Sequence, residues 1–309
     1  MTTAALPGRF ARWWGGDLAY AFRHSPVAVG SALVLFICLA AALLAPWIAP
    51  HNPFDLATLN LSDALAPPRG MAGSKPGYLL GTDDQGRDVL SAIMFGARIS
   101  LLVGVAAVAL AVAIGVSLGL VAGYAGGRLD AVIMRAADVQ LSFPAILIAL
   151  LIDGIARAVL PREAHSEVAL LVLVVAIGVS NWPQYARTVR GSTMVEKNKE
   201  YVQAARVIGV TPAAIVFRHL LPNVLGPVLV LATINIATAI VLEATLSFLG
   251  IGVPPTRPSL GTLIRVGNDF LFSGEWWITI FPGAALVILV LAINLLGDWL
   301  RDALNPRLQ

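Results

Sequence analysis

The chain has 309 residues, of which 58% are hydrophobic and 13% are charged, and its formal net charge at pH 7 is +3. A soluble domain usually carries about 25% charged residues, so the composition excludes a globule of this size with a fully solvated surface. The basic residues lie between apolar blocks and form no stripe, which argues against nucleic acid as a partner. Membrane lipid is therefore the expected solvent for much of the chain.

Residues 1–26 contain Arg9, Arg12 and Arg23 and precede the first long apolar run. That run is long enough to cross a bilayer, and no clear small-residue cleavage site follows it. We therefore interpret it as a retained first helix and not as a cleaved signal peptide. Trp13 and Trp14, together with the nearby arginines, predict a short amphipathic segment on the inner membrane surface.

Six apolar stretches predict membrane-spanning helices, because about 20 apolar residues are needed to cross a bilayer. They are residues 27–48, 99–123, 131–152, 168–182, 224–242 and 278–296. Gly104, Gly115 and Gly119 in the second stretch would let neighbouring helices approach closely. The expected fold class is an all-α integral membrane bundle of six transmembrane helices.

Cytoplasmic loops of membrane proteins carry an excess of lysine and arginine. In this chain these residues are more frequent on the side of the membrane that holds both termini, so both termini are expected in the cytoplasm. The predicted organisation is a cytoplasmic N-terminal segment (1–26), a first transmembrane helix (27–49), an extracytoplasmic loop (50–97), a transmembrane core (98–300) with a cytoplasmic loop (184–222), and a cytoplasmic tail (301–309).

The cytoplasmic loop predicts two short helices joined by a sharp turn. Residues 199–208 are good helix formers, with Tyr201, Val202, Ala205 and Ile208 on one apolar face. Gly209 is placed to end this helix in a left-handed conformation. Next, a threonine and a proline at 211 and 212 suit the start of a second helix over 213–220, which Pro222 would stop. Such a rigid knob (residues 199–217) is suited to docking into a groove on a soluble partner.

The same loop carries a resemblance to a known family. Gln203-Ala204-Ala205, then Gly209, then Leu221-Pro222 match the spacing of the EAA loop in permeases of binding-protein-dependent ABC importers. Gln203 replaces the usual Glu, which removes a charge from the expected contact with the ATPase, and His219 stands where Ile is common. The resemblance implies that the following residues form the ATPase-coupling site: Glu200, Gln203, Ala204, Ala205, Gly209, Thr211, Pro212, Leu221 and Pro222.

Further stretches resemble the dipeptide/oligopeptide branch of these importers. Residues 81–91 (GTDDQGRDVLS) resemble its extracytoplasmic signature, and residues 246–252 and 295–302, with Asn305-Pro306, resemble the C-type permease of a pair. The signature positions are Gly81, Thr82, Asp83, Gly86, Arg87, Asp88 and Ser91. We interpret this segment as a capped turn, in which Arg87 pairs with Asp84 or Asp88. The alternatives are a contact with a partner protein and, much less favoured, a metal site.

The resemblance implies a type I ABC importer permease with a MetI-like bundle in the bacterial inner membrane. Its partners would be a second, different permease, two ATP-binding subunits and an extracytoplasmic solute-binding protein. The sequence has no GxxxxGKS or GxxxxGKT phosphate loop, so the chain is not expected to be an enzyme. It needs no cofactor or metal, because ATP and Mg²⁺ would be bound by the partner subunits.

The solute is expected to be a short peptide, with nickel or glutathione as alternatives inside the importer class. A secondary transporter or channel without ATPases is the rival class, although the sequence shows no midplane charge relay. Asn235, Thr238 and Glu243 in the fifth span are candidates for the translocation path. An equally weighted alternative is that Glu243 ties helices together.

Overall fold

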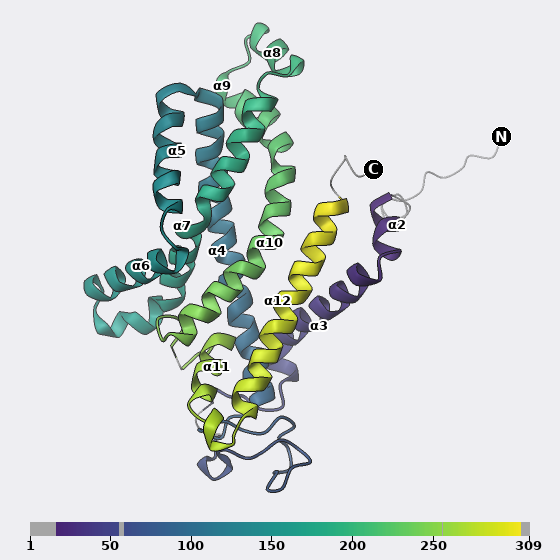
Figure 1. The fold of residues 1–309 in the computed structure, drawn as a ribbon, viewed down its shortest axis with the longest axis vertical. Coiled ribbons are helices and arrows are strands. Elements are labelled where there is room, and N and C mark those ends of the chain that lie inside the picture. Colours follow the sequence, from purple (N-terminus) through teal and green to yellow (C-terminus); the bar gives the residue numbers. More distant parts are fainter. Residues whose placement is uncertain (1–16, 56–58, 255, 304–309) are drawn as a thin grey trace, which may run out of the picture.

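The computed structural model describes residues 17–55, 59–254 and 256–303, and this part of the chain is built from helices (Figure 1). In it, 5 helices are long and apolar enough to cross a membrane. They are α3 (Pro26–Ile48), α4 (Val89–Ala125), α7 (Arg162–Glu196), α10 (Leu221–Phe248) and α12 (Trp277–Ala303). The shorter elements are α2 (Asp17–Arg23), η1 (Leu61–Asp63), α5 (Gly127–Leu141), α6 (Ala145–Val159), α8 (Glu200–Val207), α9 (Pro212–Ala214), η2 (Ile215–Leu220), α11 (Leu260–Asn268) and η3 (Leu271–Ser273). Trp13, Trp14 and Asn305-Pro306 lie outside the described residues.

The third predicted span is not a straight helix. Residues 131–152 are divided between α5 and α6, which are bent by 94° at a short break. Pro144 stands at the break, and a proline biases the residue before it away from helical geometry. Counting this bent pair as one broken span gives 6 spans, as the sequence predicted.

Two helices extend beyond the apolar stretches that predicted them. Helix α4 begins at Val89, inside the segment assigned to the extracytoplasmic loop, and α7 continues to Glu196 instead of ending at residue 182. The extension of α7 contains arginines, and such charged residues end the apolar stretch and predict a loop. In the structure, however, Arg190 Nη2 donates to Asp130 Oδ2 of α5 at 2.7 Å. Because the charge has a partner on the adjacent helix, the helix can continue where hydropathy predicts its end.

Helix α4 packs most extensively against α7, and small residues make this close approach possible. A Cβ atom added at Gly115 would lie 2.4 Å from Cβ of Tyr185, and one at Gly119 would lie 2.7 Å from the carbonyl oxygen of Ala186. Gly104 packs against α10 in the same way. The close packing predicted from these three glycines is confirmed.

The knob and the segment between the first two long helices lie at opposite ends of the molecule. Figure 1 shows α8 and α9 at one end, and the segment between α3 and α4 at the other. Helix α2 and the C-terminal end of α12 lie toward the α8 end, where the rings of Phe22 and Trp299 are in edge contact at 5.1 Å between centroids. The described ends of the chain therefore lie toward the end that carries the knob.

Candidate functional site

The knob contains the sharp glycine turn that the sequence predicted. Gly209 has φ +81°, a left-handed conformation that glycine adopts without steric strain. Its N–H donates to the carbonyl of Arg206 at 3.1 Å, and the N–H of Val210 donates to that of Ala205 at 3.0 Å. These two bonds form a Schellman motif, which satisfies the last carbonyls of α8 and fixes the direction of the chain that follows.

The second half of the knob differs from the prediction. Thr211 caps α9 as expected, since its Oγ1 accepts from the N–H of Ala214 at 3.4 Å. Pro222, however, does not end the helix, because the chain is helical from Pro212 to Phe248. Residues Ile215–Leu220 form a π-helix, in which the N–H of Leu221 reaches Val216 five residues back. This wider turn relieves the clash that the Pro222 ring would otherwise make with the preceding turn.

The knob has a buried root and an exposed tip. Val202, Ala205 and Ile215 are buried in the main apolar core. Val207 and Ile208, on either side of the end of α8, are 87% and 78% exposed. The sequence placed Ile208 on one apolar face with Val202 and Ala205, but in the structure only those two are buried and Ile208 faces outward. Val207 and Ile208 give the knob an apolar tip, and Phe217, in η2, is a further exposed apolar side chain.

The position where the family pattern has Glu makes a local contact. Gln203 is exposed, and its Nε2 donates to the carbonyl oxygen of Lys197 at 3.3 Å, across the turn between α7 and α8. Glu200 and Ala204 are also exposed on this helix. The amide of Gln203 therefore stabilises the turn without contributing a charge to the surface.

A chain of polar contacts joins the knob to both neighbouring helices. The Tyr201 hydroxyl donates to Glu196 Oε1, at the end of α7, at 2.8 Å. Asn223, in the first turn of α10, donates through Nδ2 to the Tyr201 hydroxyl at 3.1 Å. The guanidinium of Arg206 also lies 5.6 Å from the ring centroid of Tyr124, at the end of α4. The knob is thus connected to α7, α10 and α4, and none of these partners was predicted from the sequence.

The segment of residues 81–91 forms a tightly bonded turn at the opposite end of the molecule. Asp83 Oδ1 accepts from the N–H groups of Gln85 and Arg87, both at 2.9 Å, and its Oδ2 accepts from Arg87 Nε at 2.6 Å. Arg87 thus forms an ion pair with Asp83, a partner that the sequence analysis did not name. Asp88 caps α4 by accepting from the N–H of Ser91 at 2.9 Å.

This turn also contacts distant parts of the chain. Thr82 Oγ1 accepts from the N–H of Ala66 at 2.8 Å, and the carbonyl of Thr82 accepts from Trp277 Nε1 at 3.1 Å. Ser91 Oγ accepts from the N–H of His51, just beyond α3, at 3.1 Å. Gly81 and Gly86 complete the turn with positive φ. The signature residues therefore hold together the starts of α4 and α12 and the segment that follows α3.

The three candidates for the translocation path separate into two groups. Asn235 is half-buried and donates through Nδ2 to the Tyr185 hydroxyl at 3.0 Å, and Thr238 is exposed. Glu243 has no exposed surface. Its Oε2 accepts from Ser100 Oγ of α4, and its Oε1 from Ser247 Oγ, both at 2.7 Å. In the structure this carboxyl group ties helices together, whereas Asn235 and Thr238 remain candidates for contact with a solute.

The fold and these sites define an integral membrane protein with several spans and a structured helical knob at one end. Residues 115–309 match the family described as "Binding-protein-dependent transport system inner membrane component", and residues 13–68 match the "N-terminal TM domain of oligopeptide transport permease C". The chain therefore belongs to the family of inner membrane components of binding-protein-dependent transport systems. This membership confirms that it is a transport component and not an enzyme.

Several curated relatives cover nearly the whole chain. The di/tripeptide transport system permease protein DppC of Pseudomonas aeruginosa is 38% identical over 93% of this chain and 90% of that protein. The dipeptide transport system permease proteins DppC of Haemophilus influenzae and Escherichia coli are 41% and 42% identical, over 91% and 93% of this chain and 90% and 91% of those proteins.

The fold is shared with a solved structure. A chain of the MetNI methionine ABC transporter, in an inward-facing conformation, aligns with a TM-score of 0.54 and 22% identity, over 69% of this chain and 96% of that chain. At this identity the similarity shows the fold alone. Together with the family match, it confirms the type I importer permease bundle that the sequence predicted.

Proposed function

We propose that this chain is the C-type permease subunit of an ATP-driven importer of short peptides. It forms the translocation path with a second, different permease and receives solute from an extracytoplasmic solute-binding protein. Two ATP-binding subunits, which hold the ATP and Mg²⁺, dock on the cytoplasmic side. The relatives named for dipeptide or di/tripeptide transport support peptides over the alternatives, nickel and glutathione.

The observation that carries this proposal is the shape of the knob (residues 199–217). A helix that presents apolar side chains at its tip and is anchored by a buried root suits insertion into an apolar groove of another protein. Val207 and Ile208 remain exposed on the isolated chain, although they lie outside the helices that lipid can cover. A groove on each ATP-binding subunit would remove this apolar surface from water.

The connections of the knob support a role in coupling. Because Tyr201 bonds both Glu196 and Asn223, a displacement of the knob carries the ends of α7 and α10 with it. Both helices pack against α4. ATP-driven closure of the two ATP-binding subunits would therefore tilt these helices as a group and open the path toward the extracytoplasmic side, as in other rigid-body transitions.

The proposed orientation has the knob and both termini in the cytoplasm, and the turn of residues 81–91 outside. In this arrangement the turn is a structural anchor for the extracytoplasmic ends of the helices, while Asn235 and Thr238 face the solute path. Gln203 contributes to the shape of the coupling loop without the charge of the usual Glu.

Reconstitution into proteoliposomes tests the function directly. The complex of this chain, the second permease and the two ATP-binding subunits is given binding protein loaded with radiolabelled alanyl-alanine. We expect uptake that requires both ATP and binding protein, with unlabelled dipeptide competing better than glutathione or Ni²⁺. Uptake in the absence of ATP or of the ATP-binding subunits would instead indicate a secondary transporter or channel.

A further inference from the structure

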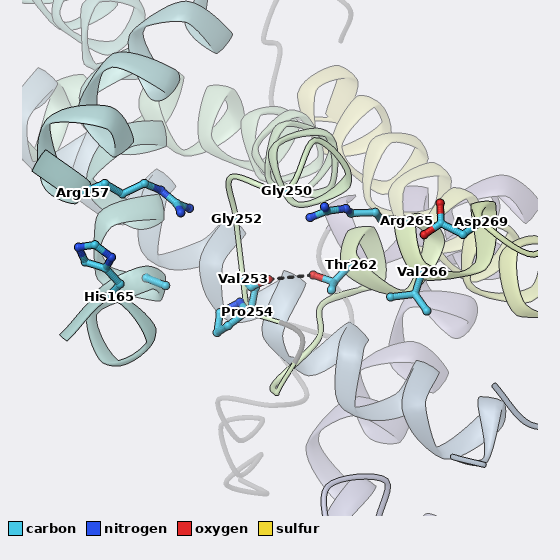
Figure 2. Close-up of a pocket in the computed structure, with 11 residues that line it drawn as sticks. Arg157, His165, Gly250, Gly252, Val253, Pro254, Thr262, Arg265, Val266 and Asp269 are labelled. Carbon is cyan, nitrogen blue, oxygen red and sulfur yellow. Dashed lines mark hydrogen bonds between the residues drawn. The ribbon is translucent and has the colours of Figure 1, made fainter. Parts of the chain in front are cut away.

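A cavity of about 490 Å³ lies between the turn that joins α6 to α7 and the loop that follows α10 (Figure 2). Arg157 and His165 line it from the α6–α7 side, and Arg265, on α11, lines it from the other side. Neither the knob nor the turn of residues 81–91 contributes to its lining. Its size lies in the range of small-ligand pockets, which is roughly 300–1,000 Å³.

Arg265 has an uncompensated charge at the wall of the cavity. Within the described part of the chain, it has no hydrogen-bond or ion-pair partner. Figure 2 shows its side chain extending toward Gly250 and away from Asp269, the acidic residue on the same wall. A Cβ atom at position 250 would lie 2.3 Å from Nη1 of Arg265. Gly250, which has φ +83°, therefore leaves the space that this guanidinium occupies.

Arg157 reaches the cavity from the opposite side with a fixed orientation. Its Nε donates to Asp153 Oδ2 at 2.6 Å, an ion pair within α6. This bond uses one of the five N–H donors of the guanidinium and leaves the terminal nitrogens available. Figure 2 shows the group pointing from α6 toward the loop at Gly252. Two guanidinium groups thus approach one cavity from two separate elements.

The chemistry of the lining points to a small ligand with a carboxylate. A guanidinium presents parallel N–H donors that match the two oxygens of a carboxylate. The lining also includes apolar side chains, among them Ala169, Val253 and Val266, which suits the uncharged part of a small molecule. The cavity is also larger than the tip of one acidic side chain requires.

We propose that this cavity binds the terminal carboxylate of a short peptide on its way through the permease, with Arg157 and Arg265 as the carboxylate ligands. The inference rests on the proposed function, which supplies the peptide. The same chemistry has a second source, an acidic side chain of the solute-binding protein, and two experiments separate these sources.

The first experiment measures binding without the binding protein. The assembled complex in nanodiscs is titrated with radiolabelled alanyl-alanine and, separately, with its C-terminal amide. We expect the free acid to bind the wild type, and Arg157→Gln and Arg265→Gln each to weaken it by about tenfold or more, as loss of a charge-assisted hydrogen bond does. The matched control is Arg257→Gln. Arg257 is an exposed arginine in the loop that follows α10, and it does not line the cavity. Equal binding of acid and amide, or of wild type and variants, would overturn the proposal.

The second experiment uses ATP-dependent uptake with loaded binding protein. We expect Arg265→Gln to lower uptake of alanyl-alanine while ATP hydrolysis remains stimulated by the binding protein. Loss of that stimulation, with unchanged dipeptide binding in nanodiscs, would assign the carboxylate to the binding protein and overturn the proposal. Basal ATP hydrolysis and a single gel-filtration peak confirm that each variant is assembled. If the wild type binds the dipeptide in nanodiscs but imports none, the proposed function fails while the carboxylate site stands.

Discussion

The hydroxyl of Tyr201 donates a hydrogen bond to Oε1 of Glu196 at 2.8 Å, and so joins α8 to the last residue of α7. The same hydroxyl accepts from Asn223 Nδ2, in the first turn of α10, at 3.1 Å. One phenol therefore connects the knob to the two helices on either side of it in sequence. We infer that these contacts make the knob move together with the membrane-spanning bundle.

Replacing Tyr201 by Phe removes both contacts and keeps the ring. We expect a loss of about 0.5–1.5 kcal/mol in the free energy of unfolding, the usual net contribution of a hydrogen bond. We also expect a lower stimulation of ATP hydrolysis by loaded binding protein, because the knob would move more independently of α7 and α10. Tyr20→Phe is the control, since it removes the hydroxyl of an exposed tyrosine on α2. Unchanged stability and unchanged stimulation in Tyr201→Phe would argue against the connection.

The same environment affects the ionisation of Tyr201. Removal from water, followed by the hydrogen bond to Glu196 and its negative charge, raises the pKa of Tyr201 from 10.0 to about 12. Because the folded-state pKa is above the unfolded one, this contribution to stability is full below about pH 10 and is lost as the pH rises through 12. The difference in tyrosinate absorbance between wild type and Tyr201→Phe should titrate near pH 12. A midpoint near pH 10 would contradict the hydrogen-bonded phenol.

Substitutions of Glu243 test whether its buried carboxyl group holds the helices together or faces the solute path. Glu243→Ala leaves the hydroxyls of Ser100 and Ser247 without their acceptor, and we expect it to lower stability by about 1–3 kcal/mol. Glu243→Gln keeps the shape and one acceptor oxygen, so its loss should be smaller. Combining each change with Ser100→Ala in a double-mutant cycle measures the interaction between α4 and α10. If Glu243→Ala leaves the thermal midpoint of unfolding unchanged but alters dipeptide uptake, Glu243 lines the translocation path and does not hold the helices together.

Two glycines of the α4–α7 pair should respond to alanine in opposite directions. A Cβ at Gly119 would lie 2.7 Å from the Ala186 carbonyl oxygen, so Gly119→Ala must push the helices apart. We expect this change to lower the free energy of unfolding by about 1–3 kcal/mol. A Cβ added at Gly191, inside α7, would have no atom within 4 Å, and alanine there should stabilise the helix by up to about 1 kcal/mol. Thermal unfolding of the purified chain in detergent distinguishes these results. Equal effects at both sites would contradict the close approach.

The sequence predicted best those features that local chemistry decides. The turn at Gly209, the cap at Thr211 and the start at Pro212 depend on residues within a few positions of each other, and all three are found in the structure. The apolar stretches likewise identified the long helices, because the length needed to cross a bilayer is a property of each segment alone.

Features that depend on distant partners cannot be predicted from the local sequence. The extension of α7 relies on the pairing of Arg190 with Asp130, 60 residues away. The partner of Glu243 on α4 is Ser100, 143 residues away. The chain stays helical through Pro222 because a π-helix precedes it, and no residue pattern in the sequence predicts that π-helix. In each case the contact between segments, and not the local sequence, decides the outcome.

Docking of the ATP-binding subunits on the knob (residues 199–217) is tested most directly by co-purification from the native membrane in mild detergent. Ile208→Asp places a charge at the exposed tip without disturbing the buried root. Phe272→Asp is the matched control, since Phe272 is 96% exposed and lies outside the knob. We predict that wild type and Phe272→Asp recover a second permease and the ATP-binding subunits, whereas Ile208→Asp recovers the second permease alone. Full recovery of the ATP-binding subunits with Ile208→Asp, or their absence from the wild type, would contradict the proposed docking.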